Sequence, residues 1–243
     1  MPAGNWEARQ LQAVVFLRKA VPATDIFSQL VGEAPELQQE KPKEAIRLQS
    51  GPFLRGQLQV TIDPVRVDIV LSPVFGADAL LGSSQTLGEF SAELNDFACT
   101  IRKWLPGCGL PASRLALVAQ AFAPAESPTS AYEILKDNLT SVTVQPGKMR
   151  DLWFRVNWPV SSDLTEEKYL NRLTTWASMT VLARAGAPGG AITTMIEKFY
   201  AYREIDVNSP AEHPNELPAD QMVPIFDEIC RVILATAETG ERP

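Results

Sequence analysis

The chain has 243 residues, 45% hydrophobic and 21% charged, which is typical of a globular protein and not of a disordered one. Its net charge is −7, and an acidic field repels phosphate backbones, which argues against general nucleic-acid binding. No stretch approaches the roughly 20 apolar residues of a membrane-spanning helix, and the N-terminus lacks a signal-peptide pattern. The three cysteines form no CxxC pair, as expected of reduced thiols, so we expect a cytoplasmic protein with no membrane partner.

The first 110 residues predict a strand, a helix, three further strands and a closing helix. Apolar and polar residues alternate along 57–72 around a turn at Asp63-Pro64, which indicates two strands of an antiparallel sheet with one buried face. A three–four spacing of apolar residues between 87 and 105 indicates an amphipathic helix that ends at Pro106-Gly107. The other expected elements are a strand at 11–18, a helix from its N-cap Thr24 to Val31, a loop at 33–43 and a strand near 44–50.

Residues 111–243 repeat this order of elements. The expected elements are a strand at 114–122, a helix at 130–139, strands at 151–160, 171–185 and 192–207, and a helix at 219–236. The repetition predicts an internal duplication of a strand, helix, three strands, helix unit; the alternative is coincidence, because many α+β proteins begin this way. We therefore expect an α+β fold with an antiparallel sheet or sheets and helices on one face. Its halves would be 1–110 and 111–243, or one continuous domain.

An acidic segment dominates the last third of the chain. Residues 204–230 contain seven acidic side chains and no Lys or Arg. Such a segment fits a docking surface for a protein partner with a basic surface. The alternative is a solvated loop followed by the first turn of the last helix, where an acid stabilises the helix dipole. The predicted partner-binding residues are Glu204, Asp206, Glu212, Glu216 and Asp220.

Two of these carboxylates allow a second hypothesis. Glu204 and Asp206 are two residues apart on a predicted strand, so they point to the same face, and Asn208 completes an E-x-D-x-N run. Oxygen ligands of this kind suit Mg²⁺ or Ca²⁺, although the same run also describes the solvated end of a strand. Lys198 lacks the Glu-x-Lys spacing of restriction-type nucleases. We therefore predict no metal site and no cofactor.

Other catalytic patterns are weak. The single histidine, His213, lies in a Pro-rich loop and cannot build a His-based metal site alone. The sequence contains no GxSxG, and Ser83-Ser84 resembles a nucleophile turn only loosely. Phosphate-binding glycine loops are absent from the sequence as well. Trp153 and Trp158 are predicted on opposite faces of one strand, so one of them could be exposed and anchor a partner.

The order of elements resembles that of an uncharacterised, sporadically distributed family of bacterial proteins of about this length. The local likeness lies in the last third, where a strand ending Glu204-x-Asp206-x-Asn208 precedes a loop and a closing amphipathic helix. The family has no established activity, so the resemblance gives no residue a role. Its patchy distribution implies mobile, accessory or defence-related genes.

These patterns lead to a first hypothesis of a non-enzymatic protein-binding module of the inhibitor, antitoxin, immunity or adaptor type. One alternative is a carboxylate-based divalent-metal phosphoesterase that uses Glu204 and Asp206. The other is a small-molecule sensor with a pocket between sheet and helices.

Overall fold

The computed structural model describes residues 5–21, 24–74, 86–186, 192–211 and 215–241, with the backbone alone at 183–186 and 192–196. Within these residues the chain forms an antiparallel sheet and four α-helices, which confirms the α+β class. The strands are β1 (Glu7–Leu17), β2 (Leu37–Lys41), β3 (Ile46–Phe53), β4 (Gly56–Ile62), β5 (Arg66–Ser72), β6 (Gly88–Glu89), β7 (Ala112–Ala125), β8 (Trp153–Asn157), β9 (Val160–Ser161), β10 (Tyr169–Gly186) and β11 (Ile192–Asn208). The helices are α1 (Ile26–Val31), α2 (Phe90–Trp104), α3 (Pro128–Asn138) and α4 (Ala219–Thr239).

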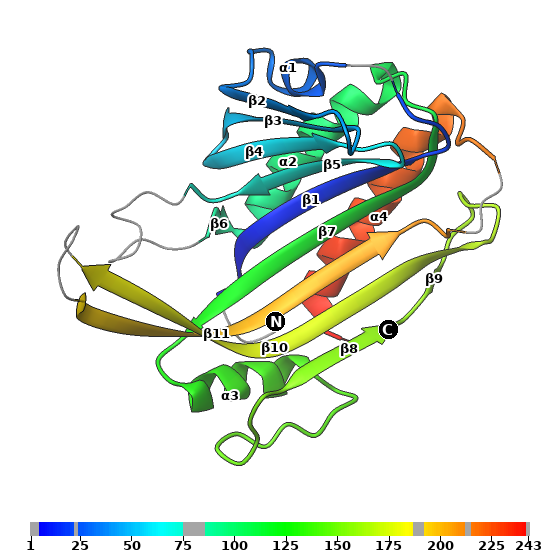
Figure 1. The fold of residues 1–243 in the computed structure, drawn as a ribbon. Coiled ribbons are helices and arrows are strands. Elements are labelled where there is room, and N and C mark those ends of the chain that lie inside the picture. Colours follow the sequence, from blue (N-terminus) through cyan, green and yellow to red (C-terminus); the bar gives the residue numbers. More distant parts are fainter. Residues whose placement is uncertain (1–4, 22–23, 75–85, 187–191, 212–214, 242–243) are drawn as a thin grey trace.

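The sheet is continuous across both halves of the chain (Figure 1). Its strand order is β2-β3-β4-β5-β1-β7-β11-β10-β8, with the short β6 beside β1 and the short β9 beside β10. The halves meet where β1 pairs with β7, with Leu11 opposite Ala119 and Val15 opposite Leu115. The two predicted halves are therefore joined edge to edge by main-chain pairing.

The two halves share one arrangement of strands. In each half the first strand pairs with the last, β1 with β5 and β7 with β11. The next strand outward is the one before the last, β4 in the first half and β10 in the second. A helix follows each first strand, and another follows each last strand. This arrangement is what a duplication would produce, but common ancestry itself stays a prediction.

The helices pack on one face of the sheet. Leu11, Ala13 and Val15 of β1 point to that face and are buried in one core with Phe97 of α2 and Phe226 of α4. This core also includes apolar side chains of α1 and α3. Figure 1 shows α2 and α4 behind the sheet. No described helix covers the opposite side of the sheet, which carries Gln12, Gln120, Glu204 and Asp206 and is called the open face below.

Helix α2 follows the predicted spacing closely. Its apolar stripe, including Phe90, Leu94 and Phe97, is buried against the sheet. The Glu89 side chain caps the helix by accepting hydrogen bonds from the backbone N–H groups of Ser91 and Ala92, at 3.0 and 2.7 Å. The helix gives way to a 3₁₀ turn at Leu105–Gly107, so the predicted stop at Pro106-Gly107 is confirmed.

A buried arginine of the sheet forms a hydrogen bond with helix α4. Arg203 of β11 is 2% exposed, and its guanidinium lies 4.3 Å from the Trp6 ring centroid and 4.8 Å from that of Phe90. Its Nη1 donates to the carbonyl oxygen of Ala237 at 2.9 Å. Ala237 lies in the last turn of α4, where carbonyl groups lack helical partners and a cation is favoured. Burial lowers the pKa of Arg203 to about 9.

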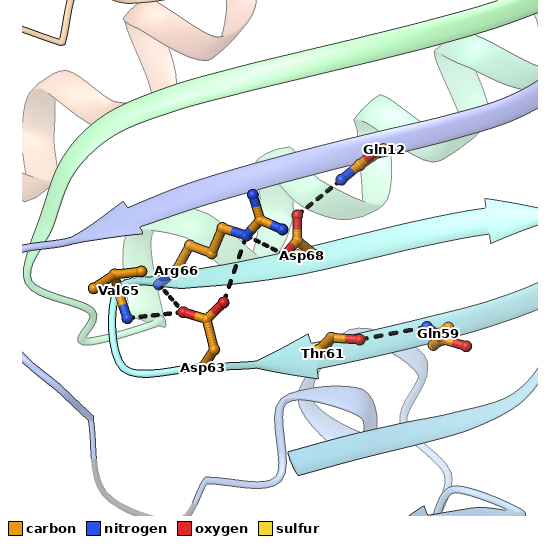
Figure 2. Close-up of polar contacts among 7 residues, drawn as sticks. All are labelled: Gln12, Gln59, Thr61, Asp63, Val65, Arg66 and Asp68. Carbon is orange, nitrogen blue, oxygen red and sulfur yellow. Dashed lines mark hydrogen bonds and ion pairs between the residues drawn. The ribbon is translucent and has the colours of Figure 1, made fainter. Parts of the chain in front are cut away.

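The turn between β4 and β5 confirms the prediction at Asp63 (Figure 2). The Asp63 carboxylate accepts from the backbone N–H groups of Val65 and Arg66, both at 2.8 Å. On the open face beside this turn, Asp68 contacts the Arg66 side chain at 2.8 Å and accepts from the Gln12 amide at 2.8 Å. Asp63, from which the turn was predicted, therefore stabilises the turn through its side-chain hydrogen bonds.

Three local predictions are wrong. The strand expected at 151–160 ends at Asn157, so Trp158 lies outside it and does not share a strand with Trp153. Residues 37–41 form strand β2, not part of a loop, and all five side chains are exposed. An edge strand with no buried side needs no apolar alternation, so its pattern resembles that of a loop. The N-cap of α1 is Asp25, not Thr24, because the Asp25 carboxylate accepts from the backbone N–H of Ser28 at 3.0 Å.

Candidate functional site: an acidic pocket at the end of the sheet

A pocket of about 350 Å³ lies where two loops meet, beyond the start of β10 and the end of β11. One loop connects β9 to β10, and the other connects β11 to α4. The pocket is lined by Asp163, Leu164, Thr165, Glu166, Glu167, Lys168, Ser209, Pro210, Asn215, Glu216, Leu217, Pro218 and Gln221.

The charged groups of the lining are mostly acidic. Its described residues include the carboxylates of Asp163, Glu166, Glu167 and Glu216 and one ammonium group, that of Lys168. The Lys168 ammonium lies 4.0 Å from Asp163, whose side chain is fully exposed. An exposed ion pair of this length holds its partners weakly, so the Asp163 carboxylate remains accessible to an incoming cation.

Glu216 has a cationic neighbour outside the pocket lining. Its carboxylate lies 3.5 Å from the ammonium of Lys19, and both side chains are more than half exposed. The nearby Leu164 side chain is 43% exposed. The pocket therefore combines carboxylates with an apolar surface, which suits a side chain with an aliphatic stem and a cationic end.

Side-chain hydrogen bonds fix the β9–β10 loop. The Thr165 hydroxyl donates to the carbonyl oxygen of Tyr169 at 2.9 Å and accepts from its N–H at 3.1 Å. The backbone N–H of Leu164 donates to the Ser162 hydroxyl at 3.2 Å, and that hydroxyl donates to the Glu228 carboxylate of α4. The loop is thus held to helix α4.

The second wall of the pocket is anchored to β7. Ser209 donates its backbone N–H to the carbonyl oxygen of Leu115 at 3.0 Å, and its hydroxyl accepts from the Leu115 N–H at 3.0 Å. The Leu217 N–H donates to the carbonyl oxygen of Ala112 at 2.7 Å. Both walls are therefore hydrogen-bonded to regular elements, as is usual for pre-formed ligand pockets.

The structure separates the predicted partner-binding residues into different places. Glu216 lines the pocket, and Asp220 is exposed in the first turn of α4. Glu204 and Asp206 lie on the open face of β11 and do not line the pocket. Glu212 lies outside the described residues, as does His213. Among the described members of the acidic set, Glu216 alone lines the pocket, so the acids do not form one contiguous row.

Glu204 is part of a hydrogen-bonded group on the open face. Its Oε2 accepts from the Gln120 amide at 2.9 Å and from the Tyr202 hydroxyl at 3.1 Å. Burial is the main cause that raises the pKa of Tyr202, and the neighbouring Glu204 charge adds to it. The hydroxyl therefore stays protonated and continues to donate to Glu204.

Asp206 lies two residues further along the same strand and is half-buried. Its Oδ1 accepts from the Asn208 amide at 2.8 Å. Burial raises the pKa of the Asp206 carboxyl, and the Glu204 charge raises it further. The hydrogen bond from Asn208 and the charges of Arg114 and Arg155 act in the opposite direction. Burial is the larger effect, so the structure favours the protonated form more than water does.

The described residues contain no group of three His, Cys, Asp or Glu side chains placed to hold a metal ion. On the open face Glu204 and Asp206 are accompanied by amides and arginines instead. The metal-binding hypothesis for this pair stays a prediction. In the described part of the chain, no helix is long and apolar enough to cross a membrane.

Sequence reasoning missed three pocket carboxylates, those of Asp163, Glu166 and Glu167. Their local signal is the run D-L-T-E-E at 163–167, which is short and far from Glu216 in the chain. Only the antiparallel pairing of β10 with β11 brings the start of β10 beside the end of β11, where Asn171 is opposite Asn208. The pocket therefore depends on strand pairing that the local patterns do not specify.

The fold and the pocket define an α+β protein with one helix-covered antiparallel sheet and an acidic hollow at its end. No family model matches the chain, and no curated protein matches it.

Proposed function

We propose that this chain is a non-enzymatic protein-binding module whose acidic C-terminal surface engages a protein partner with a basic surface. The observation that carries this function is the pocket in which Glu216 is joined by Asp163, Glu166 and Glu167. The pocket suits a lysine or arginine side chain of the partner, because its carboxylates meet the cation and Leu164 meets the aliphatic stem. An inhibitor, antitoxin, immunity or adaptor role fits such a surface, and the bacterial resemblance favours a defence-associated one.

The test is capture of a partner from the native host with three forms of the tagged protein. The first is wild type, and the second carries Asp163→Lys, Glu166→Lys and Glu216→Lys, which reverse exposed pocket charges. The matched control carries Glu44→Lys, Glu133→Lys and Glu238→Lys, which reverse the same number of exposed charges elsewhere. We expect a stoichiometric partner that wild type and control retain, that the pocket variant loses, and that salt releases.

Equal capture by the pocket variant and wild type would contradict this function. A cationic small molecule is the second candidate ligand, because the pocket volume of about 350 Å³ falls in the range of small-molecule sites, roughly 300–1,000 Å³. Native mass spectrometry of the purified protein separates the two. A stoichiometric small-molecule adduct, lost in the pocket variant, would favour the sensor hypothesis.

A further inference from the structure

The two outer edges of the sheet differ in their protection. At one edge, β2 has only exposed side chains, includes Glu40 and Lys41 and is followed by Pro42. Charged side chains and proline are the usual means by which an edge strand avoids pairing with another chain. At the other edge, β8 has the sequence Trp-Phe-Arg-Val-Asn, without proline, lysine or an acidic residue. Arg155 is the one charged side chain of β8, so the β8 edge is less protected than the β2 edge.

The outer side of β8 pairs with no strand of the described residues. Because hydrogen bonds in an antiparallel ladder alternate between the two sides of a strand, one set of β8 main-chain groups is directed away from β10. Figure 1 shows β8 as the last strand on its side of the sheet. The β8 edge therefore offers donors and acceptors to an added strand.

Two side chains on the open face of β8 are those most often found at the centre of protein interfaces. Trp153 is 65% exposed, and its ring stacks on Tyr202 with centroids 6.5 Å apart. Arg155 is exposed and makes no hydrogen bond or ion pair with a described residue. Tryptophan and arginine are enriched among residues that dominate binding energy. Here they are two residues apart on one strand, so both face the same side.

The β8 sequence is complementary to itself in one register. In an antiparallel pair centred on Phe154, Trp153 of each copy lies opposite Arg155 of the other, so the interface holds two arginine–tryptophan pairs. Phe154 then lies opposite Phe154 of the second copy, on the helix-covered side. A register centred on Arg155 instead places two like charges opposite each other, which is destabilising. Of these two registers, the residue types favour the one centred on Phe154.

We propose that β8 is a self-association edge, at which a second copy of this chain pairs antiparallel in the register centred on Phe154. The contact is isologous, so it closes into a two-fold dimer and does not extend into a fibre. The sheets of the two copies become continuous, and the exposed Trp153 is covered. This interface is separate from the acidic pocket, so the dimer and the basic partner bind different surfaces.

The test is sedimentation velocity of the full chain over a range of micromolar concentrations, with two substitutions at one position. Trp153→Lys places lysine opposite Arg155 of the second copy, and we expect the dimer to be lost. Trp153→Glu places a carboxylate opposite Arg155, and we expect the dimer to persist. Both variants replace the same exposed side chain, so far-UV circular dichroism should give the same secondary structure for the two, which shows that both are folded.

The lysine and glutamate variants are expected to differ only in the register centred on Phe154. In another register, position 153 would not lie opposite Arg155, so the charge placed there would make no difference of this kind. A wild-type chain that stays monomeric throughout the range overturns the proposal. A dimer that survives Trp153→Lys, or one that both substitutions abolish, also overturns it.

Discussion

At the scale of single residues, Asp206 is a side chain whose ionisation the fold opposes. Burial raises its pKa above the ordinary value of 3.8, although the Asn208 amide donates to it at 2.8 Å. At a pH between the ordinary and the raised pKa, the folded chain keeps a proton on Asp206 that the unfolded chain has already released. The stabilisation from this proton is complete below the ordinary pKa and is lost as the pH rises through the raised value.

The substitution Asp206→Asn removes this titration while keeping the size and polarity of the side chain. We expect Asp206→Asn to gain stability relative to wild type as the pH rises from about 4 to about 7, because the variant has no buried charge to form. Urea denaturation of both proteins at the two pH values measures the difference. A difference in unfolding free energy that does not change with pH would contradict the assignment of burial as the main cause.

At the scale of elements, the short helix α1 depends on its cap. Asp25 accepts from the backbone N–H and the hydroxyl of Ser28, at 3.0 and 2.6 Å, and from the Gln49 amide at 3.2 Å. Gln49 of β3 in turn accepts from the Phe27 N–H at 3.1 Å. A helix of 6 residues is too short to be stable by itself, so these bonds fix it on the sheet.

Asp25→Ala should lower the unfolding free energy by about 1 kcal/mol, the usual cost of losing an N-cap. Thr24→Ala, the neighbouring control, should cost less, because the capping oxygen belongs to Asp25. Chemical denaturation of the two variants gives both values. An equal or larger loss for Thr24→Ala would show that Thr24, as the sequence predicted, has the capping role.

At the scale of the whole molecule, the two halves have one hydrophobic core. Leu11 and Leu71 of the first half belong to the same cluster as Leu117, Ile205 and Phe226 of the second. The halves also pair directly, because β1 and β7 are neighbours in the centre of the sheet. Separating them would expose apolar side chains and two central strand edges together.

We therefore expect the full chain to unfold in one cooperative transition, even though the sequence divides into 1–110 and 111–243. Tryptophan fluorescence and far-UV circular dichroism should give coincident denaturation curves. Trp6 and Trp104 precede residue 110 and Trp176 follows it, so fluorescence reports on both parts. Two separated transitions would instead indicate that the halves are independent domains.

Much of the fold follows from local spacing. The alternation at Leu58, Val60 and Ile62 predicts β4, and the apolar stripe from Phe90 to Trp104 predicts α2. Both patterns are visible because one side of each element is buried in the core. Strand β2 has no buried side chain, so its five residues carry no such pattern. Burial of one side is therefore what makes an element predictable.

The candidate site is less predictable than the fold. Glu216 was expected to bind a partner because of its acidic neighbours in the chain, but its neighbours in the pocket are Asp163 and Glu166. Strand alternation predicts that Glu204 and Asp206 point to the same side of β11. In the structure both lie on the open face. Which side is open depends on where the helices pack, and strand alternation does not specify this.

Local patterning was thus sufficient for the α+β class, for most element positions and for the acidic character of the last third, because these depend on neighbouring residues. Three features required the order of strands in the sheet. They are the meeting of the β9–β10 loop with the β11–α4 loop, the single shared core and the position of Trp153 on an edge strand. Strand order brings together residues that are distant in the chain. Hydrophobic alternation shows which side of a strand is buried, but it is the same whichever strand lies alongside, so it does not specify which strands pair.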